Sequence, residues 1–237
     1  MKSHGSGATQ SQREARSRRR SVVRRFTVST VAFKAAAGFG LSSAPASADE
    51  VYGPTGTANG YSVYLSPSSQ TSNVGCNGYN EASGAYQASL RAKDSLVSRG
   101  YKVIIGTGTV SQRIASSNSL NVDAHIPMHS NATTTADCSN PRPASSYGTI
   151  SFYAAGSSVG SRLAGELTDA IGPYSPGTND YKATEGFDEL TQTSAPAGYL
   201  EAEYHTWVSG TNWLGNSYKN TYAGRVGLAV DRTFGYP

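Results

Sequence analysis

The side chains best suited to chemistry are gathered in two short segments of the chain. The segments read AHIPMHSNA and YLEAEYH, and their carboxylate and imidazole residues are His125, His129, Glu201, Glu203 and His205. Such groups bind zinc when several of them converge, and they move protons when one lies beside a reacting bond. We expect a metal site or a proton-transfer site, against the plainer alternative that each histidine is a hydrogen-bonded core residue.

Spacing along the predicted strands limits which of these residues can act together. Glu201, Glu203 and His205 alternate, so an extended strand places them on one face. Burying three ionisable groups unpaired is costly, which predicts a metal, a proton relay or exposure of that strand end. His125 and His129 share a face but lie about 13 Å apart on an extended strand, too far to bind one metal. We interpret His125 as a core residue or as support for a ligand.

Glu81 is a further candidate because it opens a predicted helix. The segment 80–100 carries small and apolar residues at helical spacing, with Asn80 as the expected N-cap and Gly100 as the stop. A carboxylate is favoured in the first turn of any helix by the helix dipole. A capping role and a ligand role for Glu81 therefore both remain open.

A different chemistry is suggested by GSSVG, residues 156–160, which fits the G-x-S-x-G nucleophile elbow. Ser158 would be the nucleophile, Asp180 or Asp188 the acid, and His205 the base. Glycine and serine are abundant in this chain, and no glycine-rich oxyanion loop precedes the motif. We favour a turn and a helix N-cap made of small residues.

The elements that must position these residues alternate along the chain. The predicted strands are 61–67, 101–106, 122–132, 147–155 and 197–204, and the predicted helices are 80–100, 111–121, 157–171 and 216–233. Strands alternating with helices indicate an α/β fold, a single domain with a twisted, mostly parallel sheet flanked by helices. The carboxyl ends of such strands are where sites assemble, and His129 ends its strand.

The first 48 residues read as an export signal and not as part of that domain. A basic run, REARSRRRSVVRR, precedes a mildly apolar stretch that contains Lys34, and Ala46-Ser47-Ala48 has the form of a signal-peptidase site. The apolar stretch is too short and too broken to span a membrane. Residues 1–48 are predicted to be a secretory signal, with twin-arginine export as an open alternative, and 49–237 to be the mature domain.

Removing this segment reverses the sign of the net charge. The chain has 20 Lys+Arg and 16 Asp+Glu, and residues 1–48 hold nine of the basic residues and one acid, Glu14. The mature part then has 20 − 9 = 11 basic and 16 − 1 = 15 acidic residues, a net charge of −4. Nucleic-acid binding requires a basic face on the folded domain, so we predict no nucleic-acid partner.

The two cysteines of the chain, Cys76 and Cys138, should form a disulfide in an oxidising compartment. Each lies close in sequence to a candidate site residue, Glu81 or His129. The disulfide is therefore predicted to bring two loops together at the rim of the site.

The order of these pieces resembles the catalytic domain of zinc-dependent N-acetylmuramoyl-L-alanine amidases, which cleave the bond between muramic acid and the stem peptide of bacterial cell walls. The matching motifs are Glu81 in NEASGAYQ, then RGYKVIIG, Arg113 and Asn118 in SQRIASSN, His129 in HSNA, Gly148 in GTISFY, Leu163-Ala164 in RLAGEL, and Glu201 with Tyr204 in APAGYLEAEY. They run through the whole mature part, and HSNA together with YLEAEY is the most specific combination.

One motif of that family is altered here. The family has a Pro-Gly-His-Gly turn with a ligand histidine after the first strand, whereas this chain reads LSPSSQ and has Ser69 at that place. A hydroxyl is a poor zinc ligand. The chain resembles a subgroup that combines a Ser-Pro-Ser turn with an aromatic–His pair, here Tyr204 and His205. The resemblance implies that His205 replaces the missing ligand, which requires the chain to turn near Tyr204.

The resemblance implies a secreted, cell-wall-associated peptidoglycan hydrolase that uses Zn²⁺. Its metal ligands would be Glu81, His129 and His205. Glu201 would take a proton from metal-activated water and pass it to the leaving amine, with Glu203 as the structural alternative.

Two other functions stay open at this point. Because of Ser69, the chain could be a non-hydrolytic wall-binding protein of the same fold, and a serine esterase at Ser158 is a weaker alternative. In the first two cases the partner is peptidoglycan, with no stable membrane insertion once the signal is removed.

Overall fold

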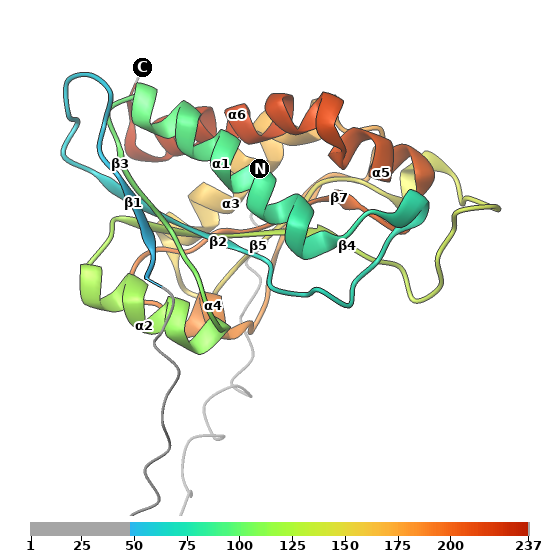
Figure 1. The fold of residues 1–237 in the computed structure, drawn as a ribbon, viewed down its shortest axis with the longest axis horizontal. Helices are drawn as coiled ribbons and strands as arrows, with labels where there is room; N and C mark the ends of the chain where they lie inside the picture. The colour runs from blue at the N-terminus through green and yellow to red at the C-terminus, as the bar shows by residue number, and fades with distance from the viewer. Residues whose placement is uncertain (1–47, 237) are drawn as a thin grey trace, which may run out of the picture. The chain divides into compact units, whose positions relative to one another are not determined.

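A twisted sheet of seven strands lies at the centre of the described residues (Figure 1). The computed structural model describes residues 48–236, and for residues 216–220 the backbone alone. The strand order across the sheet is β1-β3-β2-β4-β7-β5-β6. The bounds are β1 Glu50–Tyr52, β2 Ser62–Pro67, β3 Lys102–Ile105, β4 Ala124–Asn131, β5 Ile150–Tyr153, β6 Tyr181–Thr184 and β7 Tyr199–Tyr204.

Strand pairing is parallel through the centre of the sheet and antiparallel at two places. β2 pairs in parallel with β3 and β4, β4 with β7, and β5 with β6. β1 runs antiparallel to β3, and β5 runs antiparallel to β7. The sheet is therefore mixed, and the predicted α/β fold with a mostly parallel sheet is confirmed.

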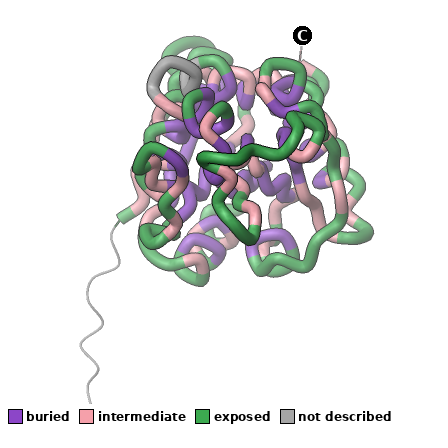
Figure 2. The backbone as a smooth tube through the Cα atoms, turned by 90° about the vertical axis from the view of Figure 1, so that its right-hand side faces the viewer, coloured by how far each residue is buried: buried purple, intermediate pink, exposed green. Residues whose placement is uncertain are grey.

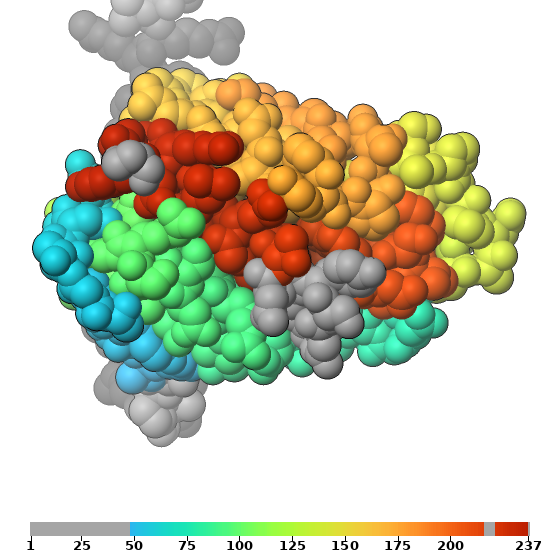
Figure 3. All heavy atoms as spheres, turned by 90° about the horizontal axis from the view of Figure 1, so that it is seen from above, coloured from blue at the N-terminus to red at the C-terminus, as the bar shows by residue number. Residues whose placement is uncertain are grey.

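Helices cover both faces of this sheet. Their bounds are α1 Glu81–Ser98, α2 Val110–Leu120, α3 Ser158–Ile171, α4 Asp188–Thr191, α5 Val208–Leu214 and α6 Asn216–Phe234. α1, α3 and α6 pack over one face, where α6 lies between α1 and α3 (Figure 3). α2 and α4 contact each other on the opposite face (Figure 1).

The main core lies between the sheet and the layer of α1, α3 and α6. Ala88, Ala92 and Leu96 recur every fourth residue along α1 and are fully buried, as the predicted helical spacing requires. Val63 and Leu65 of β2 alternate toward the same core. Figure 2 shows the buried residues concentrated inside, with exposed residues along the loops.

The elements that the sequence did not predict are the short ones. β1, β6, α4 and α5 have between three and seven residues and no clear periodicity. The predicted export signal, residues 1–48, lies outside the described residues except for Ala48. Within the described part of the chain, no helix has the length and apolar character needed to cross a membrane.

A β-bulge interrupts the alternation predicted for the last strand. His129 of β4 lies opposite Glu201 of β7, but Asn131 lies opposite Tyr204, so β7 carries an additional residue over this stretch. β7 then ends at Tyr204 and a turn follows, as expected. Because of the bulge, strict alternation does not continue from Glu201 to His205.

Candidate active site

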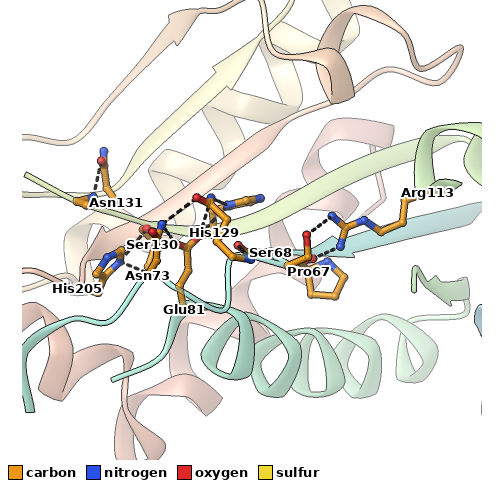
Figure 4. Close-up of polar contacts among 12 residues, drawn as sticks. Pro67, Ser68, Asn73, Glu81, Arg113, His129, Ser130, Asn131 and His205 are labelled. Atoms are coloured by element: carbon orange, nitrogen blue, oxygen red, sulfur yellow. Dashed lines mark hydrogen bonds and ion pairs between the residues drawn. The ribbon is translucent and has the colours of Figure 1, made fainter. Parts of the chain in front are cut away.

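A buried carboxylate and a buried imidazole meet where α1 begins and β4 ends (Figure 4). Asn80 caps α1 by accepting a hydrogen bond from the Ser83 backbone, which places Glu81 in the first turn. Oε1 of Glu81 lies 2.8 Å from Nδ1 of His129, and both side chains are buried. The structure therefore brings together two of the three predicted metal ligands.

The charge on Glu81 is stabilised by its neighbours. Burial alone would raise the pKa of Glu81, but the hydrogen bond and charge of His129 oppose it. Hydrogen bonds from Asn73 and Ser68 act in the same direction, and the net effect is a lowered pKa. Glu81 is accordingly an ionised carboxylate near neutral pH, the form that binds a cation.

His129 has one nitrogen at this contact and one without a partner. Its ring stacks on Tyr199 of β7, with ring centroids 4.5 Å apart. Nε2 is buried and makes no hydrogen bond among the described residues. A buried polar atom without a partner is uncommon in folded proteins, and one beside a pocket points to a missing ligand.

The turn after β2 places an amide beside the Glu81–His129 pair. Nε2 of Gln70 lies 3.3 Å from Nδ1 of His129 and 3.4 Å from Oε1 of Glu81. Asn73 donates from Nδ2 to Oε1 of Gln70 at 2.9 Å and to Oε2 of Glu81 at 2.7 Å. Gln70 and Asn73 are both uncharged amides, so no charge pattern in the sequence marks them as part of a site.

Glu201 has the environment of a proton-transfer group. It lies opposite His129 across the β4–β7 pairing, and its Oε2 atom is buried with no hydrogen-bond partner among the described residues. Burial, and then the negative charge of Glu81, raise the pKa of Glu201 well above the usual range. A carboxyl group with a raised pKa exchanges a proton more readily near neutral pH.

Glu203, the alternative candidate, is satisfied by the protein itself. Its Oε2 accepts hydrogen bonds from the Ser175 hydroxyl and from the Gly177 backbone at 3.1 Å. Its Oε1 accepts the backbone N–H of Tyr204 at 2.8 Å. These contacts hold the loop that follows α3, which is a structural role.

His205 does not join Glu81 and His129 in this structure. Its Nδ1 lies 3.0 Å from both the backbone oxygen and the hydroxyl of Ser130. Among the described residues, no set of three or more His, Cys, Asp or Glu side chains is arranged to hold a metal ion. The expected convergence of three ionisable ligands is therefore absent, because the ring of His205 is turned toward β4.

The predicted disulfide holds the backbone of His205 in place. Cys76 and Cys138 are joined, with Cα atoms 5.5 Å apart. The backbone N–H of Cys76 donates to the carbonyl of His205 at 2.8 Å, and that of Asp137 donates to Thr206 at 2.8 Å. The two loops thus meet beside the turn that follows β7.

A second His–Glu pair lies deeper, on the same face of β4. Nε2 of His125 is 3.2 Å from Oε1 of Glu189, and its Nδ1 is 3.0 Å from the Ser117 hydroxyl. The hydroxyl of Ser66 also donates to Glu189. His125 is fully buried, which agrees with its interpretation as a core residue.

The two motif residues of α2 support neighbouring loops. Arg113 is buried and donates to the carbonyl of Pro67, with Ser69 Oγ 3.4 Å from its second amino group. Asn118 donates to the carbonyl of Gln192 and accepts from the backbone of Ser194. Arg113 thereby fixes the turn that carries Gln70.

The residues of the possible serine triad are engaged elsewhere. Ser158 opens α3 and is exposed, with Ser157 capping the helix. Asp180 accepts the backbone N–H of Thr149 at 2.7 Å, and His205 contacts Ser130. Among the described residues, no hydrogen bond links Ser158 to an acid or a histidine, and the segment forms a helix start.

A pocket of about 260 Å³ opens beside the Glu81–His129 pair. Its walls include His129, Tyr199, Phe187 and Gln70, with Arg113 and Glu189 at its polar side. It is a concave, mainly apolar space with a few polar groups, which is the usual form of a small-ligand subsite.

The chemistry of two side chains at this site fits a bound metal ion. Two donors of the kinds that zinc prefers are present, the Glu81 carboxylate and the His129 imidazole. Ligand atoms about 2.0–2.1 Å from a tetrahedral zinc lie about 3.3–3.4 Å from one another. The 2.8 Å between Glu81 and His129 is a direct hydrogen bond and is shorter than that value, while Nε2 of Gln70 lies 3.3 and 3.4 Å from the same two atoms.

Solved structures similar to this chain share its fold. Neither protein-family models nor curated protein sequences match the chain. The catalytic domain of CwlV, an N-acetylmuramoyl-L-alanine amidase from Paenibacillus polymyxa, has 16% identity and a TM-score of 0.64, over 75% of this chain and 99% of that one. An N-acetylmuramoyl-L-alanine amidase from Clostridium difficile 630 has 19% identity and a TM-score of 0.65, over 75% and 98%.

A third example is Ami1, an N-acetylmuramyl-L-alanine amidase from Mycobacterium smegmatis. It has 16% identity and a TM-score of 0.62, over 76% of this chain and 99% of that one. At these identities the likeness establishes a common fold, and it covers nearly the whole length of each amidase domain.

Proposed function

We propose that this chain is a peptidoglycan hydrolase that cleaves the amide bond between N-acetylmuramic acid and the L-alanine of the stem peptide. The observation that carries the proposal is the buried, unpartnered Oε2 of Glu201 opposite His129, beside the Glu81–His129 pair. The structural likeness to proteins named N-acetylmuramoyl-L-alanine amidases supports the choice of substrate.

Glu81 and His129 would hold the metal in this proposal. When bound, zinc supplies a polarised amide carbonyl and a more acidic water molecule. Ionised Glu81 contributes negative charge to the site, while Asn73 fixes its second oxygen. Tyr199 holds the ring of His129 by stacking, so the imidazole keeps one orientation.

Glu201 would move the proton. Its Oε2 accepts a proton from the attacking water as the new C–O bond forms. It then gives that proton to the nitrogen of L-alanine as the C–N bond breaks, which leaves a muramic acid carboxylate and a free amine. The raised pKa of Glu201 suits a group that must take up and release one proton in each cycle.

The test is release of L-alanine amino groups from purified peptidoglycan, followed by mass spectrometry of the fragments. Wild-type protein should release them, a chelator should stop the reaction, and a serine-directed inhibitor should have no effect. Inhibition by the serine reagent together with chelator resistance would instead support the esterase alternative at Ser158.

A non-hydrolytic wall-binding protein is the second candidate. It is favoured by one observation, namely that an amide, Gln70, stands where a third ionisable ligand would complete the metal site. Co-sedimentation with peptidoglycan, without release of amines under any metal condition, would support this function and contradict the first.

Export is part of the proposal, since peptidoglycan lies outside the cytoplasm. The small-x-small sequence at Ala46–Ala48 would be the cleavage site. N-terminal sequencing of protein recovered from the culture medium or the wall should then begin at Asp49. Recovery of only full-length protein inside the cells would contradict export.

A further inference from the structure

We propose that the side-chain amide of Gln70 is the third metal-site group of this chain, in the place that the sequence suggested for His205. The inference rests on the proposed function, because it assumes that Glu81 and His129 hold a metal. It assigns a role to a residue of the altered LSPSSQ turn, which the names of similar proteins do not indicate.

The end of the Gln70 side chain lies close to both proposed metal ligands. Nε2 of Gln70 is 3.3 Å from Nδ1 of His129 and 3.4 Å from Oε1 of Glu81, so the end of this side chain lies within reach of both proposed ligands. Nδ1 of His205 is instead engaged by Ser130. The Gln70 amide therefore lies beside both proposed ligands, and among the described residues His205 is not grouped with them.

Nδ1 of His129 faces two groups that require opposite hydrogen-bond roles from it. The Glu81 carboxylate can only accept, so Nδ1 must donate to it at 2.8 Å. The amide nitrogen of Gln70 can only donate, so Nδ1 would have to accept from it at 3.3 Å. One nitrogen cannot do both. Half a turn of the Gln70 amide removes the conflict, because its carbonyl oxygen then faces the donating Nδ1.

The amide must turn over to act as a ligand. In this structure Oε1 of Gln70 accepts from Asn73, so the nitrogen faces the pair. An amide nitrogen has no free lone pair, whereas the carbonyl oxygen has two. Half a turn about the terminal bond exchanges them, at the loss of the Asn73 hydrogen bond. Metal binding therefore competes with this bond, and the affinity should be weaker than for three ionisable ligands.

The backbone of Gln70 is already fixed for this role. Its N–H donates to the Ser68 hydroxyl at 3.2 Å, and Arg113 donates to the carbonyl of Pro67 at the start of the turn. Arg113 itself is buried. Only the terminal amide has to move, so little ordering is needed when the metal binds.

Zinc affinity of the purified full-length protein, measured by competition with a chromophoric chelator, tests the inference without relying on activity. Gln70→Ala should weaken zinc binding roughly tenfold or more, since even outer partners of metal ligands are worth 10–100-fold. Gln70→His should tighten zinc binding by a similar factor, because imidazole is the better ligand. His205→Ala and Ser69→Ala are the matched controls and should leave zinc affinity within about twofold.

A nuclear magnetic resonance readout separates ligation from a general change of structure. On zinc addition, the side-chain amide resonances of Gln70 should shift strongly. The side-chain amide resonances of Asn73 should shift as well, because Asn73 loses its hydrogen bond to Oε1 of Gln70. The corresponding signals of the exposed Asn77, on the neighbouring loop, should stay in place.

Three results would overturn the inference. These are unchanged zinc affinity in Gln70→Ala, loss of zinc in His205→Ala, and absence of zinc binding in the wild type. The proposed function fails separately. If wild-type protein binds zinc through Gln70 yet releases no amines from peptidoglycan, the inference stands and the function falls. If Glu201→Gln abolishes amine release while Gln70→Ala keeps full zinc affinity, the function stands and the inference falls.

Discussion

His129 and His125 lie on the same face of β4, and each pairs with a glutamate from a helix. Nδ1 of His129 is 2.8 Å from Glu81, and Nε2 of His125 is 3.2 Å from Glu189. The second nitrogen of His125 is also bonded, to Ser117 at 3.0 Å, whereas Nε2 of His129 has no partner among the described residues. Two pairs of the same chemical type thus differ in how completely the protein satisfies them.

The same difference separates the two glutamates of β7. Glu203 accepts three hydrogen bonds from the surrounding chain, while Oε2 of Glu201 accepts none among the described residues. A satisfied polar group stabilises the fold, and an unsatisfied one costs free energy unless something binds to it. The site-forming groups thus differ from the structural groups not in residue type but in whether all their polar atoms are hydrogen-bonded by the protein.

The largest expected effect is on catalysis. Glu201→Gln should lower amine release from peptidoglycan by about 10²–10⁴-fold, the usual contribution of a general acid–base group, while the fold and zinc content are kept. Glu203→Gln is the matched control on the same strand and should retain amine release, because Glu203 contacts Ser175, Gly177 and Tyr204 and not the site. An inactive Glu203→Gln with an active Glu201→Gln would reverse the assignment.

The next effect concerns the inner pair and its stability. Glu189→Ala leaves His125 buried without its partner, and breaking a buried pair in this way costs about 3–5 kcal/mol. Urea denaturation should show that loss, with zinc affinity of the folded protein unchanged. His129→Ala, at the His129–Glu81 pair, should instead abolish zinc binding. A Glu189 variant as stable as wild type would end the distinction between the two pairs.

Sequence reasoning found the framework and the charged groups of the site. The helix at Glu81 and the strand ending at His129 follow from periodicity and caps, which are local properties, whereas the choice of Glu201 over Glu203 followed from the family resemblance. The arrangement of His205 depends on a β-bulge in β7 and on the hydroxyl of Ser130, which no spacing rule reveals. The contacts of Gln70 also escape any local pattern, because its place is set by a turn that Arg113 holds from a distant helix.

The disulfide lies at the end of β4 that carries His129, and not at the end that carries His125. Cys76 and Cys138 are 62 residues apart, and closing a loop of that size stabilises the fold by about 4 kcal/mol in the chain-entropy model, with measured values of about 2–4. Cys76→Ser/Cys138→Ser should lower the unfolding free energy by that amount. Free thiols in the exported wild-type protein, detected without a reductant, would contradict the bond itself.

The smallest effect is the pH dependence of stability, and it has opposite signs for two buried glutamates. Burial would raise the pKa of Glu189, but the hydrogen bond and charge of His125, with Ser66 and Arg113, outweigh it and lower that pKa. Its contribution to stability is therefore present above the unfolded value of about 4.3 and is lost as pH falls through the folded value. Burial raises the pKa of Glu203 despite its three hydrogen bonds, so its contribution is lost as pH rises above about 4.3.

Urea denaturation of wild type and Glu189→Gln across pH 3–7 measures the first of these signs. At pH 7 the variant should be less stable, because glutamine lacks the negative charge that Arg113 favours at this buried position. As pH falls below about 4.3, wild-type Glu189 takes up a proton, the two side chains become alike, and the gap should narrow. The same scan on Glu203→Gln isolates the opposite slope. A gap between wild type and Glu189→Gln that widens in acid would mean that the inner pair is not held by ionised Glu189, and the contrast between the two His–Glu pairs would then have to rest on geometry alone.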